Sequence, residues 1–182
     1  CSSDLSILAY YGIEGKTMDV TKLFAFSNCS LLTQSTEAIP QGSYKEQQET
    51  EGEGTVSTYV PFRNGLFLSA AASLALSLDC GYIYYGAHSD DAAGNAYPDC
   101  TEHFYKSMGD AIFEGSGKEC SLEAPFINHN KADVVKEGLR LGVPYHLTWS
   151  CYEGGDKPCG HCGTCIDRQA AFEANGVKDP AL

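Results

Sequence analysis

Four cysteines near the end of the chain form its most specific chemical pattern. Cys151, Cys159, Cys162 and Cys165 fall within 15 residues, and the last three are separated by two residues each. Four thiolates suit a tetrahedral Zn²⁺, and four protein ligands leave no open position for catalysis, so the pattern predicts one structural zinc ion per chain. An iron–sulfur cluster or a redox pair is the alternative. His161 lies between two of the cysteines and can replace one of them as a ligand, although four thiols already complete the set.

A second group of reactive side chains follows a predicted strand over residues 82–85. His88 and Asp91 come directly after it, and Tyr97 and Asp99 follow a few residues later. A planar heterocycle could stack on Tyr97 while a carboxylate accepts hydrogen bonds from its ring amines. The competing interpretation is a polar loop in which Asp99 caps the next helix. Cys100 is a possible nucleophile, but no base for it is identified.

Two basic side chains lie at the starts of predicted helices. Arg63 precedes Asn64 at the entrance to an Ala/Leu-rich helix, where the helix dipole disfavours a cation unless an anion is bound. Lys131 follows another strand and could reach a phosphate. The alternatives are an Arg63 paired with a neighbouring carboxylate and a Lys131 that is simply solvated.

Strands and helices alternate through the middle of the chain, which predicts an α/β fold with a mostly parallel sheet. Ligands bind such sheets at the carboxyl ends of the strands, so we expect the site among the residues that follow the strands: residues 86–100, residues 127–131 and residue 150 onward. Residues 40–57 have no apolar periodicity and are predicted to form a mobile surface loop. We expect helices over residues 3–11, 64–79, 101–113, 131–141 and 165–174, and strands over residues 16–20, 82–85, 121–126 and 145–149. The helix over residues 64–79 is apolar on most faces and is expected to be buried, as is the strand over residues 82–85.

Composition restricts the partners. The chain has 182 residues, 12 basic and 24 acidic, and a net charge of −12. Such an acidic surface repels phosphate backbones and anionic lipids, so no nucleic-acid partner and no membrane partner are expected. The cysteines and the lack of a secretory signal favour a reducing, cytoplasmic location.

Together these segments resemble the 7-cyano-7-deazaguanine synthase family of queuosine and deazapurine biosynthesis. The resemblance covers the chain from about residue 4 to the last helix. It rests on Val60-Pro-Phe-Arg-Asn-Gly65, Gly86-Ala-His-Ser-Asp-Asp91, Tyr97-Pro-Asp-Cys100, Asn130-Lys-Ala-Asp133 and Thr148-Trp-Ser-Cys151 with the cysteines that follow.

The resemblance implies a Rossmann-like, adenine nucleotide alpha hydrolase-like domain of the ATP pyrophosphatase type over residues 1–150 and a zinc-binding segment over residues 151–182. It implies an ATP-dependent carbon–nitrogen ligase, usually a homodimer, that converts 7-carboxy-7-deazaguanine and ammonia to 7-cyano-7-deazaguanine, with ATP and Mg²⁺ as substrate. On this basis Arg63, Asp91 and Lys131 are expected to be catalytic. Substrate contacts are expected from Asn64, His88, Tyr97 and Asp99.

One feature of the family does not occur in this sequence. Members carry a Ser-Gly-Gly-x-Asp-Ser phosphate-binding loop after their first strand. This motif does not occur in the 182 residues. The expectation is a chain that begins after the second strand and is inactive by itself. Two other functions stay open: a related zinc enzyme that modifies another target in a defence system, and a non-catalytic zinc-stapled binding module.

Overall fold

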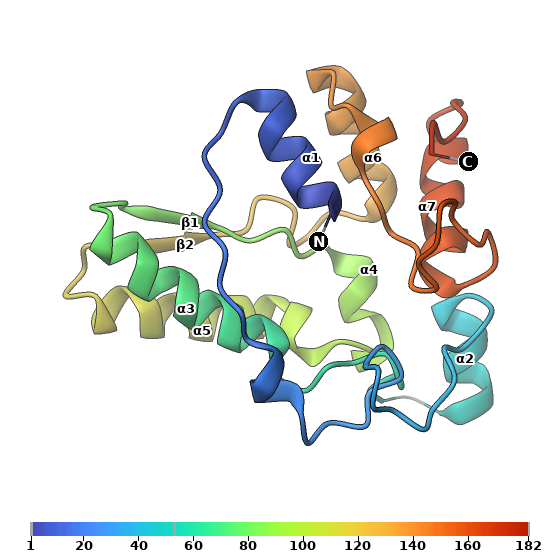
Figure 1. The fold of residues 1–182 in the computed structure, drawn as a ribbon, viewed down its shortest axis with the longest axis horizontal. Coiled ribbons are helices and arrows are strands. Elements are labelled where there is room, and N and C mark those ends of the chain that lie inside the picture. Colours follow the sequence, from blue (N-terminus) through green and yellow to red (C-terminus); the bar gives the residue numbers. More distant parts are fainter. Residues whose placement is uncertain (1, 53, 182) are drawn as a thin grey trace.

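The fold is built on a parallel pair of strands connected through a helix (Figure 1). The computed structural model describes residues 2–52 and 54–181. Strand β1 (Tyr82–Tyr84) pairs in parallel with β2 (Ser121–Glu123), with Ile83 opposite Leu122. Helix α5 (Glu102–Gly115) lies between them in the sequence. A parallel pair needs a crossover of this kind, and the predicted α/β class with a parallel sheet is confirmed.

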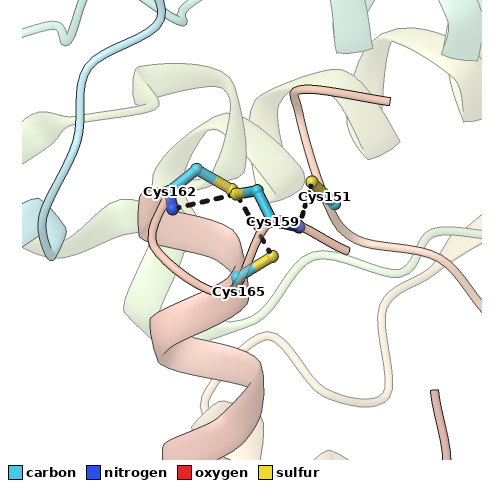
Figure 2. A group of neighbouring side chains, drawn as sticks. All are labelled: Cys151, Cys159, Cys162 and Cys165. Carbon is cyan, nitrogen blue, oxygen red and sulfur yellow. Dashed lines mark hydrogen bonds between the residues drawn. The ribbon is translucent and has the colours of Figure 1, made fainter. Parts of the chain in front are cut away.

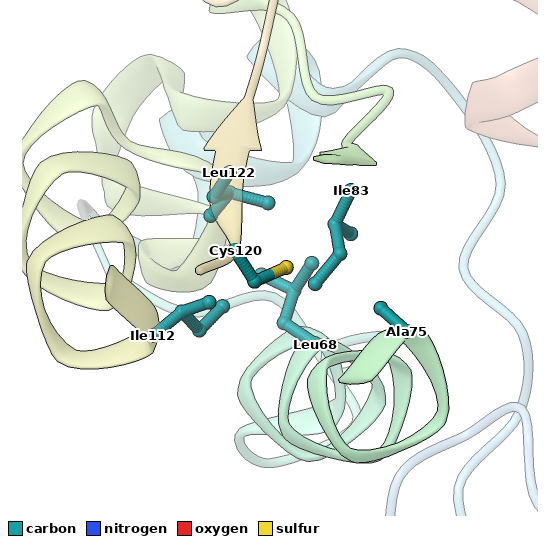
Figure 3. Close-up of a cluster of buried hydrophobic side chains, with 6 residues drawn as sticks. All are labelled: Leu68, Ala75, Ile83, Ile112, Cys120 and Leu122. Carbon is teal, nitrogen blue, oxygen red and sulfur yellow. The ribbon is translucent and has the colours of Figure 1, made fainter. Parts of the chain in front are cut away.

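Helices α3 (Arg63–Ser77) and α5 cover one face of the strand pair and enclose the largest apolar core. Figure 3 shows side chains from both helices and both strands converging. The buried members are Leu68, Ala75, Ile83, Ile112, Cys120 and Leu122. Tyr82 and Tyr84 point to the opposite face and are 64% and 74% exposed, so β1 is not the fully buried strand that was predicted.

The remaining predicted helices are present. They are α1 (Ser2–Tyr11), α6 (Lys131–Leu141) and α7 (Gly163–Ala174). Helices α6 and α7 lie side by side in Figure 1 and pack together through Val135, Ala171 and Phe172. The prediction that α3 is buried on most faces is wrong, because Phe67, Leu74 and Leu76 are exposed.

Two predicted strands are also wrong. Residues 16–20 form no strand, and residues 16–19 are exposed, without the partner that a strand needs to satisfy its backbone. Residues 145–147 form a 3₁₀ turn, η4, directly after Pro144. The fixed φ of proline favours such a turn, and the side chain of Thr148 closes it by donating to the Tyr145 carbonyl oxygen.

The expectation of an irregular loop over residues 40–57 is wrong in its central part. Helix α2 (Tyr44–Glu51) forms there, and a reciprocal capping box between Ser43 and Glu46 starts it. Gln41 forms an isolated bridge with Cys162, and the Gly42 N–H donates to the carbonyl oxygen of His161 over 3.2 Å. The start of this segment is therefore hydrogen-bonded to the segment that carries the four cysteines, residues 150–165, which we call the cysteine segment.

A buried ion pair holds Asp179 against α7. Arg168 donates from Nε and Nη2 to the two carboxylate oxygens of Asp179 over 2.6 and 2.8 Å, and both residues are buried. Its other amino group donates to the Thr148 hydroxyl over 2.7 Å. No helix in the described ranges is long and apolar enough to cross a membrane.

Replacing Arg168 with alanine is expected to destabilise the fold by about 3–5 kcal/mol, because Asp179 would be left as a buried, unpaired charge. Urea unfolding of the variant measures this loss. The double variant Arg168→Met, Asp179→Leu removes both charges and should recover most of the stability. Equal losses in the single and double variants would show that the ion pair is not the source of the effect.

Candidate active site

The four cysteines of the predicted metal site converge in space (Figure 2). The ligand atoms of Cys151, Cys159, Cys162 and Cys165 all lie within 4.8 Å of one another, and the Sγ atoms of Cys159 and Cys165 are 4.0 Å apart. Zn–S bonds of about 2.3 Å place the sulfurs of a tetrahedral site about 3.8 Å apart. This donor set therefore fits a zinc ion, and the predicted clustering is confirmed.

Local hydrogen bonds orient the thiols. The backbone N–H of Cys159 donates to the sulfur of Cys151, and that of Cys162 donates to the sulfur of Cys159, each over 3.3 Å. Burial opposes ionisation of Cys162, but hydrogen bonds from Thr164 and from backbone groups outweigh it and lower its pKa to about 6. His161 is exposed and its Nδ1 pairs with the Gln41 side chain, so it lies outside the group.

The cysteine segment forms one wall of a neighbouring pocket of about 160 Å³. Ser150 and Tyr152 flank Cys151, Thr164 precedes Cys165, and all three line this pocket. Cys162 contacts Thr164 directly, with 3.4 Å between sulfur and hydroxyl oxygen. Anything that fixes the four thiols therefore also fixes a wall of the pocket.

The other walls of the pocket come from the start of α3 and from two of the segments that were predicted to carry the site because they follow strands. The pocket is lined there by Arg63, Asp91, Tyr97, Cys100 and Lys131. A larger hollow of about 390 Å³ adjoins it, sharing Tyr44 and Lys131. The structure thus brings four of the predicted site residues, Arg63, Asp91, Tyr97 and Lys131, into one place.

Arg63 and Lys131 are the cations of this pocket. Within the described part of the chain, neither side-chain cation forms a hydrogen bond or an ion pair at contact distance, although the charge of Arg63 reaches the Asp99 carboxylate and that of Lys131 reaches the Asp167 carboxylate. The backbone of Lys131 is held where α6 begins, because its N–H donates to Asp90 over 2.7 Å. Two unpaired cations in a chain of charge −12 create a local site for an anion.

Asp99 and Asn64 support the start of α3 and do not line the pocket. The Asp99 carboxylate accepts the backbone N–H of Asn64 over 2.9 Å, so it caps α3 and not the helix that follows it in the sequence. Burial raises the pKa of Asp99. The side-chain amide of Asn64 donates to the Tyr85 hydroxyl and to the Asp99 carbonyl oxygen. The next helix, α5, is capped by Thr101.

His88 lies behind the pocket. Its Nε2 is 3.4 Å from Asp91, and its Nδ1 is buried with no hydrogen-bond partner among the described residues. His88 itself does not line the pocket, but it contacts the carboxylate of Asp91, which does.

Cys100 lies in the pocket wall, but its thiol is not prepared for nucleophilic attack. Burial raises the pKa of Cys100 to about 12, and the negative charge of Asp91 adds to the effect. The thiol is therefore protonated near neutral pH, and the weaker prediction of a nucleophilic cysteine loses its chemical basis.

Two tyrosines of the pocket were not predicted as site residues. Tyr44 comes from α2 and Tyr152 from the cysteine segment, and both line the pocket beside Tyr97. The Ser43–Glu46 capping box was a usable signal for the helix that presents Tyr44. For Tyr152 the only signal is its position next to Cys151.

Comparison with known proteins identifies the family. The family described as "Queuosine biosynthesis protein QueC" matches residues 2–176. The 7-cyano-7-deazaguanine synthase of Caldicellulosiruptor saccharolyticus is 44% identical over 165 residues, 91% of this chain and 69% of the relative. That of Archaeoglobus fulgidus is 45% identical over 147 residues, covering 80% and 58% of the two chains. That of Psychromonas ingrahamii is 39% identical over 169 residues, covering 93% and 73%.

These alignments span between 58% and 73% of the length of the three relatives. The match extends through the strand pair, the pocket and all four cysteines of the metal-binding group. This chain therefore belongs to the QueC family of queuosine biosynthesis proteins.

Proposed function

We propose that this protein converts 7-carboxy-7-deazaguanine and ammonia to 7-cyano-7-deazaguanine at the expense of ATP. The observation that carries the proposal is the pocket in which the unpaired cations of Arg63 and Lys131 lie with one carboxylate, Asp91. The substrate is an anionic ring rich in N–H groups. Its carboxylate can therefore pair with the two cations, and its N–H groups can donate to Asp91. The relatives share the name of this synthase, which favours it over an enzyme of a defence system or a non-catalytic zinc module.

The chemistry requires two activations. A carboxylate is a poor electrophile, so its oxygen first displaces pyrophosphate from ATP to give an acyl adenylate. Ammonia then attacks the carboxyl carbon of this adenylate. AMP leaves with one oxygen, and a proton is lost to give the amide. The amide oxygen displaces pyrophosphate from a second ATP, and the nitrogen loses one proton, which gives an O-adenylyl imidate. Loss of AMP and of the second N–H proton then leaves the carbon–nitrogen triple bond.

The pocket residues have separate proposed roles in these steps. Arg63 and Lys131 bind the carboxylate and stabilise the negative charge that develops on its remaining oxygen when ammonia attacks the acyl adenylate. Asp91 accepts hydrogen bonds from the ring N–H and the exocyclic amine, two adjacent donors that a carboxylate matches. Tyr97 forms part of the wall against which the ring packs.

The metal and the assembly belong to the same proposal. We assign a structural Zn²⁺ to the four cysteines, where it supplies cross-links between turns that bury little apolar surface. ATP is proposed to enter with Mg²⁺ on its phosphates. We further propose an ATP pyrophosphatase domain over residues 1–150 with a zinc-binding segment over residues 151–182, and a cytoplasmic homodimer.

The activity is tested on the product of the complete gene that encodes this chain. Incubation with 7-carboxy-7-deazaguanine, ammonium and ATP should yield the nitrile, detected by mass spectrometry, with two AMP formed per nitrile. Omission of ammonium should abolish the nitrile. Formation of AMP without amide or nitrile from this ring would contradict the proposed reaction.

The two aspartates are expected to separate binding from folding. Asp91→Asn should weaken binding of 7-carboxy-7-deazaguanine about ten- to a hundredfold, because a charge-assisted hydrogen bond is lost, and leave the unfolding free energy nearly unchanged. Asp99→Ala should cost about 1–2 kcal/mol of stability through loss of the α3 cap, with little change in affinity. Calorimetric titration and urea unfolding of both variants measure the two effects. Stability loss with unchanged affinity in both variants would show that Asp91 is structural.

A further inference from the structure

Three tyrosine hydroxyls meet in a closed triangle at the pocket. The oxygens of Tyr44 and Tyr152 are 3.0 Å apart, those of Tyr97 and Tyr152 are 3.1 Å apart, and those of Tyr97 and Tyr44 are 3.2 Å apart. The Thr58 hydroxyl lies 2.6 Å from that of Tyr97. All three tyrosines line the pocket, whereas Thr58 is buried behind Tyr97. We call these four groups the hydroxyl cluster.

A proton count shows what the cluster can offer a ligand. Each hydroxyl carries one proton and two lone pairs, so four hydroxyls supply four protons for the four contacts. The geometry makes Tyr97 the donor to Tyr44. Tyr97 then has no proton left, so Thr58 and Tyr152 both donate to it. Tyr44 completes the ring of hydrogen bonds by donating to Tyr152.

The lone pairs are distributed unevenly as a result. Tyr97 accepts two hydrogen bonds and is saturated. Tyr44 and Tyr152 each accept one, and each keeps one lone pair. Since no proton is left over, the hydroxyl cluster presents two adjacent acceptors and no donor to the pocket.

The cluster is neutral, and a carboxylate lies in the same pocket. A tyrosine hydroxyl has an ordinary pKa of about 10, so the three hydroxyls carry their protons near pH 7. Asp91 lines the pocket together with the three tyrosines. This side of the pocket therefore consists of acceptors, while Arg63 and Lys131 supply the cations.

We propose that the Tyr44–Tyr152 pair selects the ligand by accepting an N–H of its exocyclic amine, so that a ring bearing a carbonyl oxygen at that position is rejected. The inference rests on the proposed function and extends it to ring selectivity. Asp91 can accept the ring N–H and one amine hydrogen, and the tyrosine pair can accept the other. A carbonyl oxygen would face two lone pairs with no proton between them.

The first test uses the unmodified product of the complete gene and three rings that differ at one position. Calorimetric titration should rank 7-carboxy-7-deazaguanine first, its analogue lacking the amine about tenfold weaker, and the dioxo analogue weaker still. Equal binding of the amine and carbonyl rings would overturn the inference. No binding of any of the three would contradict the proposed function itself, and the inference with it.

The second test assigns the selectivity to the tyrosines. Tyr44→Phe and Tyr152→Phe should each lower the preference for the amine ring over the ring lacking it by about threefold or more. Thr58→Val leaves the triangle and its two free lone pairs in place, and Tyr145→Phe removes a hydroxyl that bonds backbone carbonyls of α6. Both controls should keep the preference. An unchanged preference in folded Tyr44→Phe and Tyr152→Phe would show that the cluster is only structural.

Discussion

Replacing Cys162 with serine is expected to remove the metal and loosen every segment that the cysteines hold together. Serine does not ionise as a thiol does, so the site loses one of its four anionic ligands. Cys162 is fully buried, and its backbone pairs with Gln41 ahead of α2. The substitution should therefore disturb the starts of α2 and α7 as well as the cysteine segment.

The expected loss of stability is large, because structural zinc contributes about 10–16 kcal/mol of apparent binding energy in small zinc domains. Loss of even about 3 kcal/mol lowers the Tm of a domain of this size by about 6–12 °C. Elemental analysis should give one zinc per chain in the unmodified protein and much less in Cys162→Ser. Zinc binding should also weaken as the pH falls, because the thiols must lose their protons to bind it.

Cys80→Ser is the matched control, since Cys80 is exposed and lies outside the four-cysteine group. It should leave both zinc content and Tm unchanged. A folded, zinc-free protein, or one that contains iron, would contradict the assignment.

Replacing Arg63 with alanine is expected to lower kcat/KM by about a hundredfold. Arg63 contributes one of two cations in the pocket, and a charge-assisted hydrogen bond that strengthens as the oxygen gains charge acts mainly on the transition state. The charge of Arg63 also favours the ionised form of the buried Asp99, which keeps its hydrogen bond from the Asn64 N–H in the variant. The unfolding free energy should therefore fall only modestly, and urea unfolding measures that loss separately from activity.

Arg140→Ala is the matched control for this variant, because Arg140 forms an exposed ion pair with Glu137 on α6, away from the pocket lining. Its activity should equal that of the unmodified protein. Full activity in Arg63→Ala would remove this residue from the proposed machinery.

Local signals explain which elements could be predicted from the sequence. Helix α6 begins and ends where expected, because Asn130 and Asp133 form a capping box and Gly142 adopts the left-handed conformation that ends the helix. The two-residue cysteine spacings likewise predicted a cluster that the structure confirms. Helix α2 has the same kind of capping box at its start. Its residues are mostly polar and show no apolar periodicity, so this helix was not predicted.

Long-range contacts explain what could not be predicted. The Tyr44–Tyr152 contact joins residues 108 apart in the sequence, and no local pattern encodes it. Asp99 was expected to cap the next helix or bind the ring, whereas the fold brings it to Asn64, 35 residues earlier. The predicted strand over residues 16–20 failed for a related reason: extended sequence becomes a strand only with a partner.

A crystal structure of the complete gene product with 7-carboxy-7-deazaguanine would show where the ring binds. We expect the ring in the pocket between α2, α3 and the cysteine segment. Its carboxylate should lie within hydrogen-bond distance of Arg63 or Lys131, its ring N–H should face Asp91, and its amine should face the oxygens of Tyr44 and Tyr152. A ring bound outside this pocket, or one whose carboxylate faces the tyrosines, would contradict this placement.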